Sequence, residues 1–419
     1  PDNNSYFYPA LSTSLVFTDM LELNWGSLSY GKIRGSVAQV GNDTGPYQLD
    51  QQYAVNTLAH GGQTFAQIIN VQPPVNLKPE KTTSVELGME LAFFLNRLSM
   101  DFTYYHAGTR NQILAIPVSK PSGYIESRVN AGLVNNSGVE FTIKGTPIET
   151  EDWRYEAYIN FSHNRSKVVE LAENVELYQL GGTYDQFGVR IQAEVGGEFG
   201  DIYADRSFLK DPETGERVIG SNGLPIPNPE GIEKIGNFQP DFLAGFGHNL
   251  RYKNWTLNAL FDIRKGGDIF SFTNAVSAAN GNAKYTEDNR LEWYFGAGGH
   301  VAEGIRENGT PNTIEVNPQT YYQFVGGRAS AFAEEFIYDG SFIKLRELTL
   351  GYSFPQSMLE NTFISRASIS LVGRNLFMLY KNTIGFDPEA TFNAGNDQGI
   401  EAYAFPSTRS YGFNINISL

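Results

Sequence analysis

The sequence predicts an all-β protein whose antiparallel strands form a transmembrane β-barrel. Long segments alternate apolar and polar residues with a period of two, and aromatic side chains are frequent at the apolar positions. Several of these segments run well beyond the roughly 5–6 residues of an ordinary strand. Short turns and long connections also alternate along the chain. Such segregation of loop length is typical of bacterial outer-membrane barrels.

The composition permits this barrel without requiring it. The 419 residues include 29 Phe, 23 Tyr and 43 Gly, and they contain no cysteine. A secreted β-protein would show the same bias, and the lack of cysteine excludes only disulfides and thiolate metal sites. A net charge of −15 argues against binding to a nucleic-acid backbone. No apolar run reaches the roughly 18 residues of a transmembrane helix, which excludes a helical membrane protein.

The clearest hairpin lies within residues 130–171. Val139, Phe141 and Ile143 share one face of its first strand, and the return strand from Trp153 onward alternates in the same way after a turn at residues 146–152. One wall of the hairpin is therefore apolar and the other polar. Glu140 and Glu156 are expected to pair across the polar wall. They fit an acid/base pair, although charge on a lumen wall is the ordinary expectation.

The remaining strands follow from the same alternation. We expect them at residues 5–18, 27–41, 82–95, 98–104, 242–252, 255–264, 348–355, around 369–371 and at 411–419. Longer connections are expected at residues 42–80, which are polar, and at 110–129 and 380–405. Irregular stretches are expected at residues 168–240 and 266–338, the latter with short helices near 270–279. With the hairpin, the chain is expected to contain roughly eleven strands.

An odd number of strands suggests part of a larger barrel, because bacterial single-chain barrels use even numbers. Short turns on the periplasmic side make the first and last strands both run inward. This fits the last eleven strands of a barrel of about 22, the size of plugged outer-membrane transporters, and it fits other even totals too. The chain begins Pro-Asp-Asn-Asn without Met or a signal peptide. We therefore expect a mature or truncated product.

Six motifs point to a family. They are NLKPEKTTSVELGMEL at residues 76–91, NAGLVNNSGVEFTIKGTPI at 130–148, INFSHNRSKVVEL at 159–171, FIKLRELTLGYSFP at 342–355, GRNLF at 373–377 and GFDPEA at 385–390. In these motifs and their order, the chain resembles the SusC/RagA-like TonB-dependent outer-membrane transporters of Bacteroidota. The motif positions singled out are Asn130, Gly132, Asn136, Gly138, Glu140, Arg374, Asn375, Asp387, Pro388 and Glu389.

The resemblance implies a domain organisation and partners. Residues 1–419 would form the C-terminal part of the barrel domain, without the N-terminal domain, TonB box and plug of a complete transporter. The whole protein would lie in the bacterial outer membrane and import glycans or peptides. It would act with a SusD-like surface lipoprotein as a lid and with TonB, ExbB and ExbD as the energy source. A non-energised porin or structural barrel is the alternative, followed by a soluble extracellular glycan-binding β-protein.

No catalytic constellation is evident, so an enzyme is not expected. The histidines, among them His163 and His248 within strands, form neither an HExxH nor an HxH pattern. We expect these two at lumen, aromatic-girdle or rim positions and expect no cofactor. Residues 387–389 and 396–397 offer oxygen ligands for Ca²⁺, although their spacing is not that of an EF-hand. A structural role for GFDPEA in positioning its loop is the favoured interpretation.

Aromatic side chains in the long loops are the candidates for substrate binding. They are Tyr178, Tyr184, Trp293, Tyr294, Tyr321 and Tyr322. Such rings stack on sugars or hold peptide side chains, but they also pack against other loops or a lid protein, and the two interpretations have equal weight. The glycine-rich residues 296–299 lack the GK[ST] of a phosphate loop, and we expect them to provide loop flexibility. The substrate class stays open.

Overall fold

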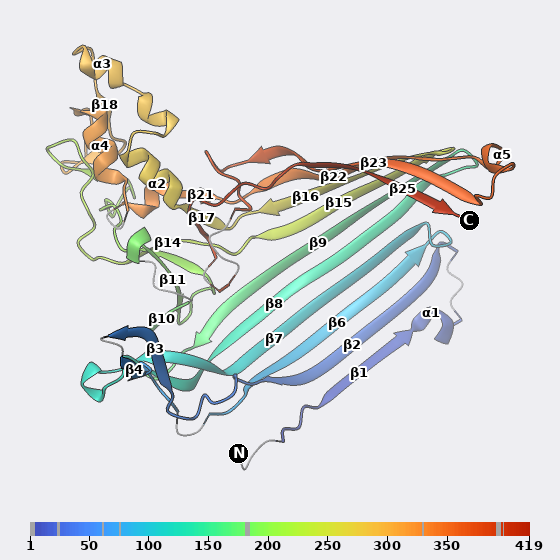
Figure 1. Cartoon of the computed structure of the whole chain (residues 1–419), viewed down its shortest axis with the longest axis horizontal. Coiled ribbons are helices and arrows are strands. Elements are labelled where there is room, and N and C mark those ends of the chain that lie inside the picture. The colour runs from blue at the N-terminus through green and yellow to red at the C-terminus, as the bar shows by residue number, and fades with distance from the viewer. Residues whose placement is uncertain are drawn as a thin grey trace. The chain divides into compact units, whose positions relative to one another are not determined.

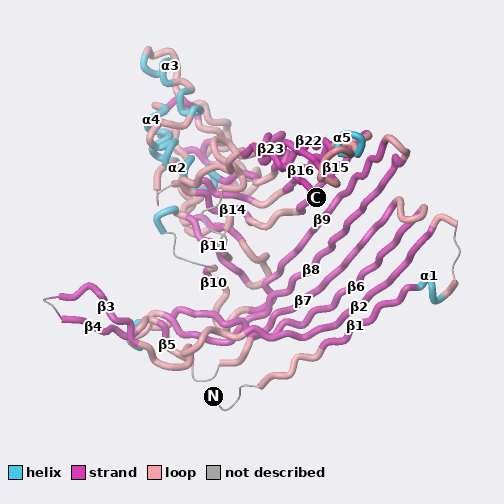
Figure 2. Tube along the Cα trace, turned by 45° about the vertical axis from the view of Figure 1, so that its right-hand side comes forward, coloured by secondary structure: helices cyan, strands magenta, loops and turns pink. Residues whose placement is uncertain are grey.

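The computed structural model consists of two compact units, which are described one at a time. It describes residues 5–22, 26–60, 63–74, 77–180, 185–328, 331–390, 395–396 and 398–419. Unit 1 comprises Pro1–Glu149, Glu156–Tyr178 and Ala193–Phe199, and unit 2 comprises Thr150–Tyr155, Gln179–Gln192 and Gly200–Leu419. Figure 1 shows long strands in both units. Helices gather in one region of unit 2, where α2, α3 and α4 appear together in Figure 2.

Unit 1 contains a sheet of long neighbouring strands. In order these are β1 (Ala10–Val16), β2 (Leu28–Asn42), β6 (Glu80–Phe93), β7 (Leu98–Pro117), β8 (Glu126–Glu149) and β9 (Trp153–Glu170). The register aligns Met89 with Phe102 and Phe102 with Phe141 in antiparallel pairs. Apolar residues therefore face one side along the whole sheet. Leu87 on this side is 57% exposed, as a lipid-facing residue would be.

Unit 2 contains long antiparallel strands of the same kind. Its strands are β15 (Phe242–Tyr252), β16 (Trp255–Lys265), β22 (Phe342–Ser353), β23 (Arg366–Lys381) and β25 (Ser410–Ser418). Aromatic rings cluster at the short turns. The ring centroids of Trp153 and Tyr252 lie 4.2 Å apart and those of Trp255 and Tyr352 lie 4.8 Å apart. Such a cluster is typical of the aromatic girdle at a membrane interface.

Shorter elements fill the long connections. In unit 1 they are α1 (Phe17–Met20), β3 (Tyr53–His60), β4 (Gln63–Ile68), β5 (Val71–Gln72) and η1 (Lys120–Ser122), with β10 (Leu177–Gln179) at its boundary. In unit 2 they are η2 (Asp185–Phe187), β11 (Val189–Glu194), β12 (Asp201–Ala204), β13 (Val218–Ile219), β14 (Glu233–Asn237), β17 (Asp268–Ser271), α2 (Phe272–Ala279), η3 (Lys284–Glu287), α3 (Arg290–Tyr294), β18 (His300–Val301), β19 (Ile305–Arg306), β20 (Glu315–Val316), α4 (Pro318–Val325), η4 (Ala333–Phe336), β21 (Ile337–Asp339), α5 (Gln356–Leu359) and β24 (Ile400–Glu401).

The best-buried apolar core of unit 2 lies in these connections. Phe208, Phe270, Phe332 and Phe336 are almost completely inaccessible to solvent. The rings of Phe208 and Phe332 stack with centroids 4.5 Å apart. The connections of unit 2 therefore form an ordered domain with a core of its own. Among the described residues, no helix has both the length and the apolar character needed to cross a membrane.

The eleven expected strands are confirmed in the described part of the chain, and so is a helix at α2. Residues 168–240 were expected to be irregular but contain the short strands β10 to β14. The β3–β4 hairpin within residues 42–80 was not predicted. The expectation of a connection at residues 110–129 was wrong, because β7 and β8 pair far into it, where Ile113 lies opposite Asn130. In the last two places, backbone hydrogen bonding continues where the apolar–polar alternation fades. Pairing of N–H and C=O groups does not depend on the side-chain pattern.

The expected pairing of Glu140 with Glu156 was also wrong. The hydroxyl of Thr142 lies 2.9 Å from the side-chain oxygen of Asn160, which fixes the register of β8 and β9. Glu140 and Glu156 lie on opposite sides of this contact along the strands. Glu156 instead forms an ion pair with Lys144, at 3.3 Å. The hairpin therefore has no acid/base pair at these two positions.

Gly138 of β8 allows a close approach of neighbouring strands. A Cβ atom at this position would lie 2.4 Å from the carbonyl oxygen of His163 and 2.5 Å from the hydroxyl of Tyr105. No real Cβ contact is so short, and a backbone carbonyl has little freedom to move away. The neighbouring strands therefore leave no room for a side chain at the motif position Gly138.

We predict that Gly138→Ala destabilises the barrel by about 1–3 kcal/mol, because the added methyl group overpacks the strands. The measurement is the thermal midpoint of the folded-to-unfolded mobility shift of the complete protein in detergent gels. Gly145→Ala in the same strand is the control, because a Cβ there meets its nearest atom at 3.8 Å. Equal midpoints for the two variants would contradict the steric explanation.

Candidate functional site

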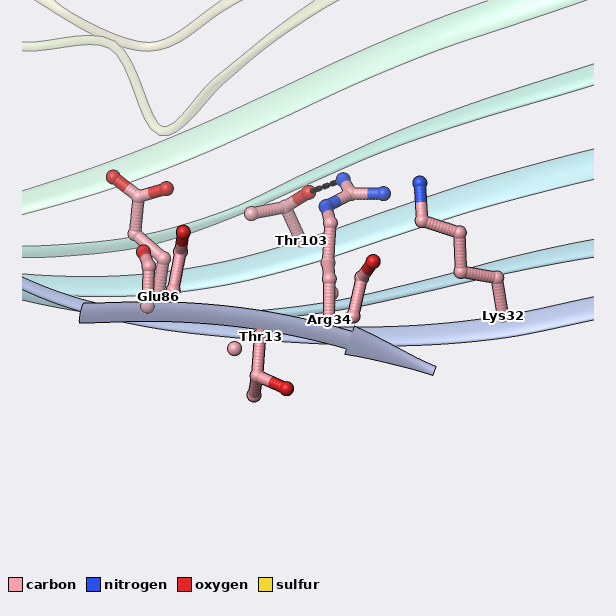
Figure 3. A pocket seen from close by; sticks show the side chains of 10 residues that line it. Thr13, Lys32, Arg34, Glu86 and Thr103 are labelled. Carbon is pink, nitrogen blue, oxygen red and sulfur yellow. Dashed lines mark hydrogen bonds between the residues drawn. The ribbon is translucent and has the colours of Figure 1, made fainter. Parts of the chain in front are cut away.

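The polar wall of unit 1 contains a network of paired charges. Arg34 of β2 lies 2.6 Å from Glu90 and 2.8 Å from Asp101, and Lys32 lies 2.9 Å from the same Glu90 oxygen. Arg34 also donates to the hydroxyl of Thr103 at 2.6 Å (Figure 3). Each cation thus has a carboxylate partner. The network contains two cations and two carboxylates, so its own charges balance.

A cleft of about 310 Å³ lies along this network. In Figure 3, Lys32, Arg34 and Glu86 point to one side of the sheet, whereas Thr13 points to the other. Gly88 leaves room for Arg34, because a Cβ there would lie 2.5 Å from the arginine Nε. A polar wall opposite an apolar one is the arrangement expected of a barrel whose inside is aqueous.

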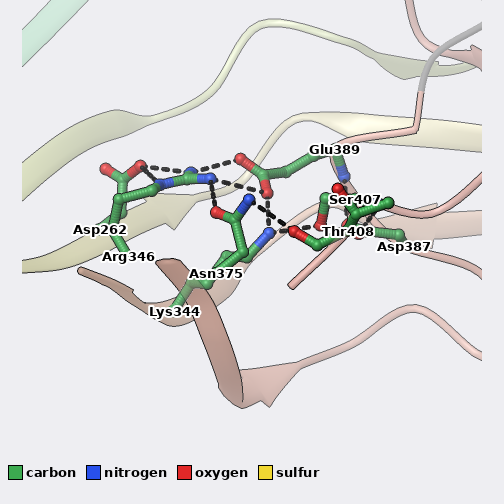
Figure 4. A network of polar contacts seen from close by, with 8 residues as sticks. All are labelled: Asp262, Lys344, Arg346, Asn375, Asp387, Glu389, Ser407 and Thr408. Atoms are coloured by element: carbon green, nitrogen blue, oxygen red, sulfur yellow. Dashed lines mark hydrogen bonds and ion pairs between the residues drawn. The ribbon is translucent and has the colours of Figure 1, made fainter. Parts of the chain in front are cut away.

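The GFDPEA motif meets a second charge network, in unit 2. Glu389 accepts hydrogen bonds from Lys344 and Arg346 of β22 (Figure 4). Arg346 also contacts Asp262 of β16 at 2.5 Å and donates to Asn375 of β23 at 3.0 Å. The side chain of Lys344 is only 3% exposed. Three strands and the motif are therefore joined by two carboxylates, two cations and the side chain of Asn375.

The same network also holds together the two ends of the connection between β23 and β25. Asp387 accepts hydrogen bonds from the backbone N–H of Ser407 at 3.0 Å and from its hydroxyl at 2.6 Å. Asn375 donates to the carbonyl oxygen of Thr408 at 3.1 Å, and Lys344 donates to the Ser407 hydroxyl at 2.6 Å. Both ends of the segment 387–408 are thus fixed to the polar face of the sheet. This supports the structural role expected for GFDPEA.

The acidic residues of this motif are ionised more readily than usual. Burial opposes ionisation of Glu389, but the hydrogen bonds from Arg346 and Lys344 outweigh it and hold its pKa below the ordinary value. Burial also opposes ionisation of Asp387, and the hydrogen bonds from Ser407 lower its pKa in the same way. The anchor therefore depends on both groups being negatively charged.

The structure brings together three of the six predicted aromatic residues. Trp293 and Tyr294 of α3 and Tyr322 of α4 line one pocket of about 390 Å³ in unit 2. Tyr321 is only 4% exposed and packs beside Tyr322, with ring centroids 5.2 Å apart. Tyr178 belongs to unit 1, and its hydroxyl accepts a hydrogen bond from the Ala115 N–H at 3.4 Å. Tyr184 lies outside the described residues.

The other motif residues take part in the hydrogen bonding, pairing or packing of the strands and their connections. Asn130 is the clearest: its side chain accepts from the Lys78 N–H at 2.6 Å and donates to the Lys78 carbonyl at 2.6 Å and the Asn111 carbonyl at 2.9 Å. It thereby joins the NLKPE and NAGLVNNSG motifs. The remaining positions are Gly132 with φ of +88°, Asn136 opposite Ala107, Glu140 opposite Thr103, Arg374 bonded to Glu347 at 2.9 Å, and the buried Pro388.

No group of three or more metal-ligating His, Asp or Glu side chains exists in the described part of the chain. Asp387 and Glu389 bind Ser407, Lys344 and Arg346, and Asp397 lies outside the described residues. The calcium site therefore stays a prediction. His248 lies among aromatic rings: its Nδ1 is 2.6 Å from the Tyr155 hydroxyl, and its ring centroid is 4.1 Å from that of Phe246.

Sequence reasoning missed the cations that hold the motif. Lys344 and Arg346 stand two positions apart in FIKLRE, a spacing that places both on the polar face of β22 once the strand is assigned. That spacing is a usable signal for an anchoring pair.

Gly299 was expected to provide flexibility, but a Cβ there would lie 2.7 Å from the ring of Trp293. This glycine is instead required by close packing.

The comparisons with known proteins agree with this fold. The family described as "TonB dependent receptor-like, beta-barrel" matches residues 1–376, and the chain belongs to this family. TonB-dependent receptor P3 of Formosa agariphila is 26% identical over 99% of this chain and 42% of that protein. TonB-dependent receptor SusC of Bacteroides thetaiotaomicron is 23% identical over 82% of this chain and 32% of that protein.

Solved structures show the same fold. The structure of the RagAB peptide transporter superposes with a TM-score of 0.75 at 20% identity, covering 100% of this chain and 44% of that one. The RagAB importer in its "open-open" state gives a TM-score of 0.74 at 21% identity, over 100% of this chain and 43% of that one. This chain is thus an outer-membrane β-barrel of the TonB-dependent receptor family, and its fold is that of the RagAB structures. It spans less than half the length of the relatives it matches.

We predict that Glu389→Ala weakens the anchor by about 3 kcal/mol, because it leaves the buried Lys344 without its carboxylate partner. The measurement is the thermal midpoint of the complete protein, together with protease cleavage within residues 382–409. Glu347→Ala is the matched control. Its partner Arg374 is 64% exposed, so that pair contributes at most about 1 kcal/mol. Equal effects of both substitutions would argue against the anchor.

The anchor should also depend on pH. The pKa of Glu389 is lower in the folded protein than its ordinary value of 4.5. Its contribution to stability is therefore fully present above that ordinary value and is lost as the pH falls through the lowered one. We expect the thermal midpoint to drop in acid by more in the unmodified protein than in Glu389→Gln. Parallel pH profiles would show that Glu389 does not carry this dependence.

Proposed function

We propose that the complete protein imports oligomeric nutrients, glycans or peptides, across the outer membrane by TonB-dependent transport. The observation that carries this proposal is the combination of a charge-balanced polar wall with an ordered loop domain that bears an aromatic pocket. A structured pocket suits a solute larger than a simple ion. The relatives are named TonB-dependent receptors, which supports the TonB-dependent part of this proposal.

In this proposal, residues 1–419 form the C-terminal part of the barrel domain. Energised transport needs a plug and a TonB box, which would lie in parts of the protein outside this chain. TonB, ExbB and ExbD would supply the energy. A SusD-like surface lipoprotein would close the outer mouth, a partner that fits the likeness to SusC and to the RagAB transporter. The loop domain of unit 2 would then contact either substrate or lid.

Within this mechanism the chain acts as a scaffold and not as an enzyme. The strands form the wall, and the Glu389 network keeps Glu389 and Ser407 on its polar face while a solute passes. No proton transfer or bond cleavage is assigned to any of its residues, and no cofactor is needed for this role.

The proposal is tested by uptake into cells that produce the complete protein. We expect fluorescently labelled oligosaccharides or peptides to enter the periplasm when TonB is present and to be excluded when TonB is deleted. Uptake that persists without TonB would show a non-energised pore and overturn the proposal. A lack of uptake of every oligosaccharide and peptide tested, with the barrel correctly assembled, would overturn it as well.

A further inference from the structure

The loop domain of unit 2 contains a pocket whose chemistry goes beyond a general role in import. It is formed by α2, α3 and α4 together with the segments between them, and its volume is about 390 Å³. This size is within the range of about 300–1,000 Å³ that is usual for small-molecule sites. All the residues that line it belong to unit 2 and are described by the structure. Nothing in the barrel wall requires such a pocket.

Trp293 forms a supported aromatic surface at this pocket. Its ring lies against Gly299, where a Cβ would be 2.7 Å from the indole Cε3 and 2.9 Å from the carbonyl oxygen of Val316. The indole is thus backed by polypeptide backbone that allows no side chain beneath it. The residue is nevertheless 41% exposed and lines the pocket. A ring that is rigidly backed and still exposed can stack on a flat ligand at little cost in side-chain entropy.

The second aromatic wall is also held in place. The hydroxyl of Tyr322 donates to the carbonyl oxygen of Tyr285 at 3.1 Å. Its ring centroid lies 5.3 Å from that of His300 and 5.2 Å from that of Tyr321. Burial raises the pKa of Tyr322 and lowers the pKa of His300. These groups are therefore uncharged at neutral pH, and the back of the pocket offers a neutral surface.

The remaining polar groups of the pocket are mostly carboxamides. Asn280, Gln319 and Gln323 line it and are exposed. A carboxamide both donates and accepts, so it bonds well to hydroxyl groups, which do the same. Arg290 is the one charged residue among those that line the pocket. Its guanidinium already donates to the Gly281 carbonyl at 2.6 Å and to the Thr286 hydroxyl at 2.5 Å.

We propose that this pocket binds a neutral sugar residue of an oligosaccharide. The apolar face of the sugar ring stacks on Trp293, and its hydroxyl groups bond to the carboxamides of Asn280, Gln319 and Gln323. The inference rests on the proposed import function and specifies the nutrient class that this site takes. It also differs from what the fold alone suggests, since the RagAB structures of the same fold are described as peptide transporters.

The pocket is less suited to peptides and to acidic sugars. Peptides are commonly bound along a free strand edge, in a helix groove or by clusters of charged side chains. Strand edges are absent from the residues that line this pocket, and so are carboxylates. A sulfated or carboxylated sugar would find a single cation at the pocket, Arg290, whose Nη2 atom makes both of the internal hydrogen bonds. A neutral, hydroxyl-rich ligand with an apolar face fits best.

The test is direct binding to the complete protein, purified in detergent. An array of neutral oligosaccharides, acidic oligosaccharides and peptides identifies the compounds that are retained, and calorimetry measures their affinity. We expect retention of at least one neutral oligosaccharide, and we expect Trp293→Ala to weaken that binding by about tenfold or more, as for loss of an aromatic stacking partner. Trp255→Ala is the control, because Trp255 has a similar exposure of 49% and lies at a barrel turn.

A second variant tests whether binding depends on the position of the Trp293 ring and not only on the presence of an indole. Gly299→Ala keeps Trp293 but places a methyl group against its ring, so the ring must move. We expect it to weaken sugar binding several-fold, while circular dichroism and the thermal midpoint of the barrel stay unchanged. Gly296→Ala lies three positions away, where a Cβ would meet no atom within 4 Å, although its positive φ adds local strain. Equal losses for the two variants would contradict the backing role of Gly299.

Three results would overturn the proposal. One is that no neutral oligosaccharide on the array is retained. Another is that peptides or acidic sugars bind and that Trp293→Ala abolishes this binding. The third is that Trp293→Ala leaves sugar binding intact but releases a co-purifying lipoprotein, which would make the pocket a docking site for a lid. Uptake is measured separately, so peptide import without sugar binding refutes this inference alone, and sugar binding without TonB-dependent uptake refutes the import function alone.

Discussion

Strand register is the constraint on which the rest of the structure depends. In lipid, every backbone N–H and C=O must bond to a neighbouring strand, and each strand must also turn its apolar residues outward. Met89, Phe102 and Phe141 meet this requirement on three adjacent strands. A shift of one residue would turn Glu90 and Asp101 toward lipid. The long ladders therefore leave one register available, and this fixes which residues line the aqueous face.

That aqueous face is built so that its charges are balanced locally. Arg34 forms ion pairs with two carboxylates, and Arg346 bridges Asp262 and Glu389. Lys344 is the extreme case, because a nearly buried ammonium is tolerated only beside its carboxylate partner. The contacts of Glu389 also hold the β23–β25 connection against the wall. Charge pairing on the wall and the fixing of this connection thus have a common physical origin.

Period-two alternation predicts the barrel strands because their two faces meet different solvents. The β3–β4 hairpin shows no such pattern, and it was missed for that reason. The erroneous pairing of Glu140 with Glu156 has another cause, since register depends on contacts such as Thr142 with Asn160 that one strand alone does not reveal. Trp293 and Tyr322 were found as loop aromatics, but the support of Trp293 by Gly299 appears only in three dimensions.

Different physical constraints act on the barrel and on the loop domain. Lipid restricts the strands so strongly that proteins with about 20% identity share the fold. The loop domain is held by its own core, in which Phe208, Phe270, Phe332 and Phe336 are buried. Its pocket is therefore able to change chemistry without disturbing the wall. A common barrel consequently does not imply a common substrate, and the nature of the solute must be read from the residues around Trp293.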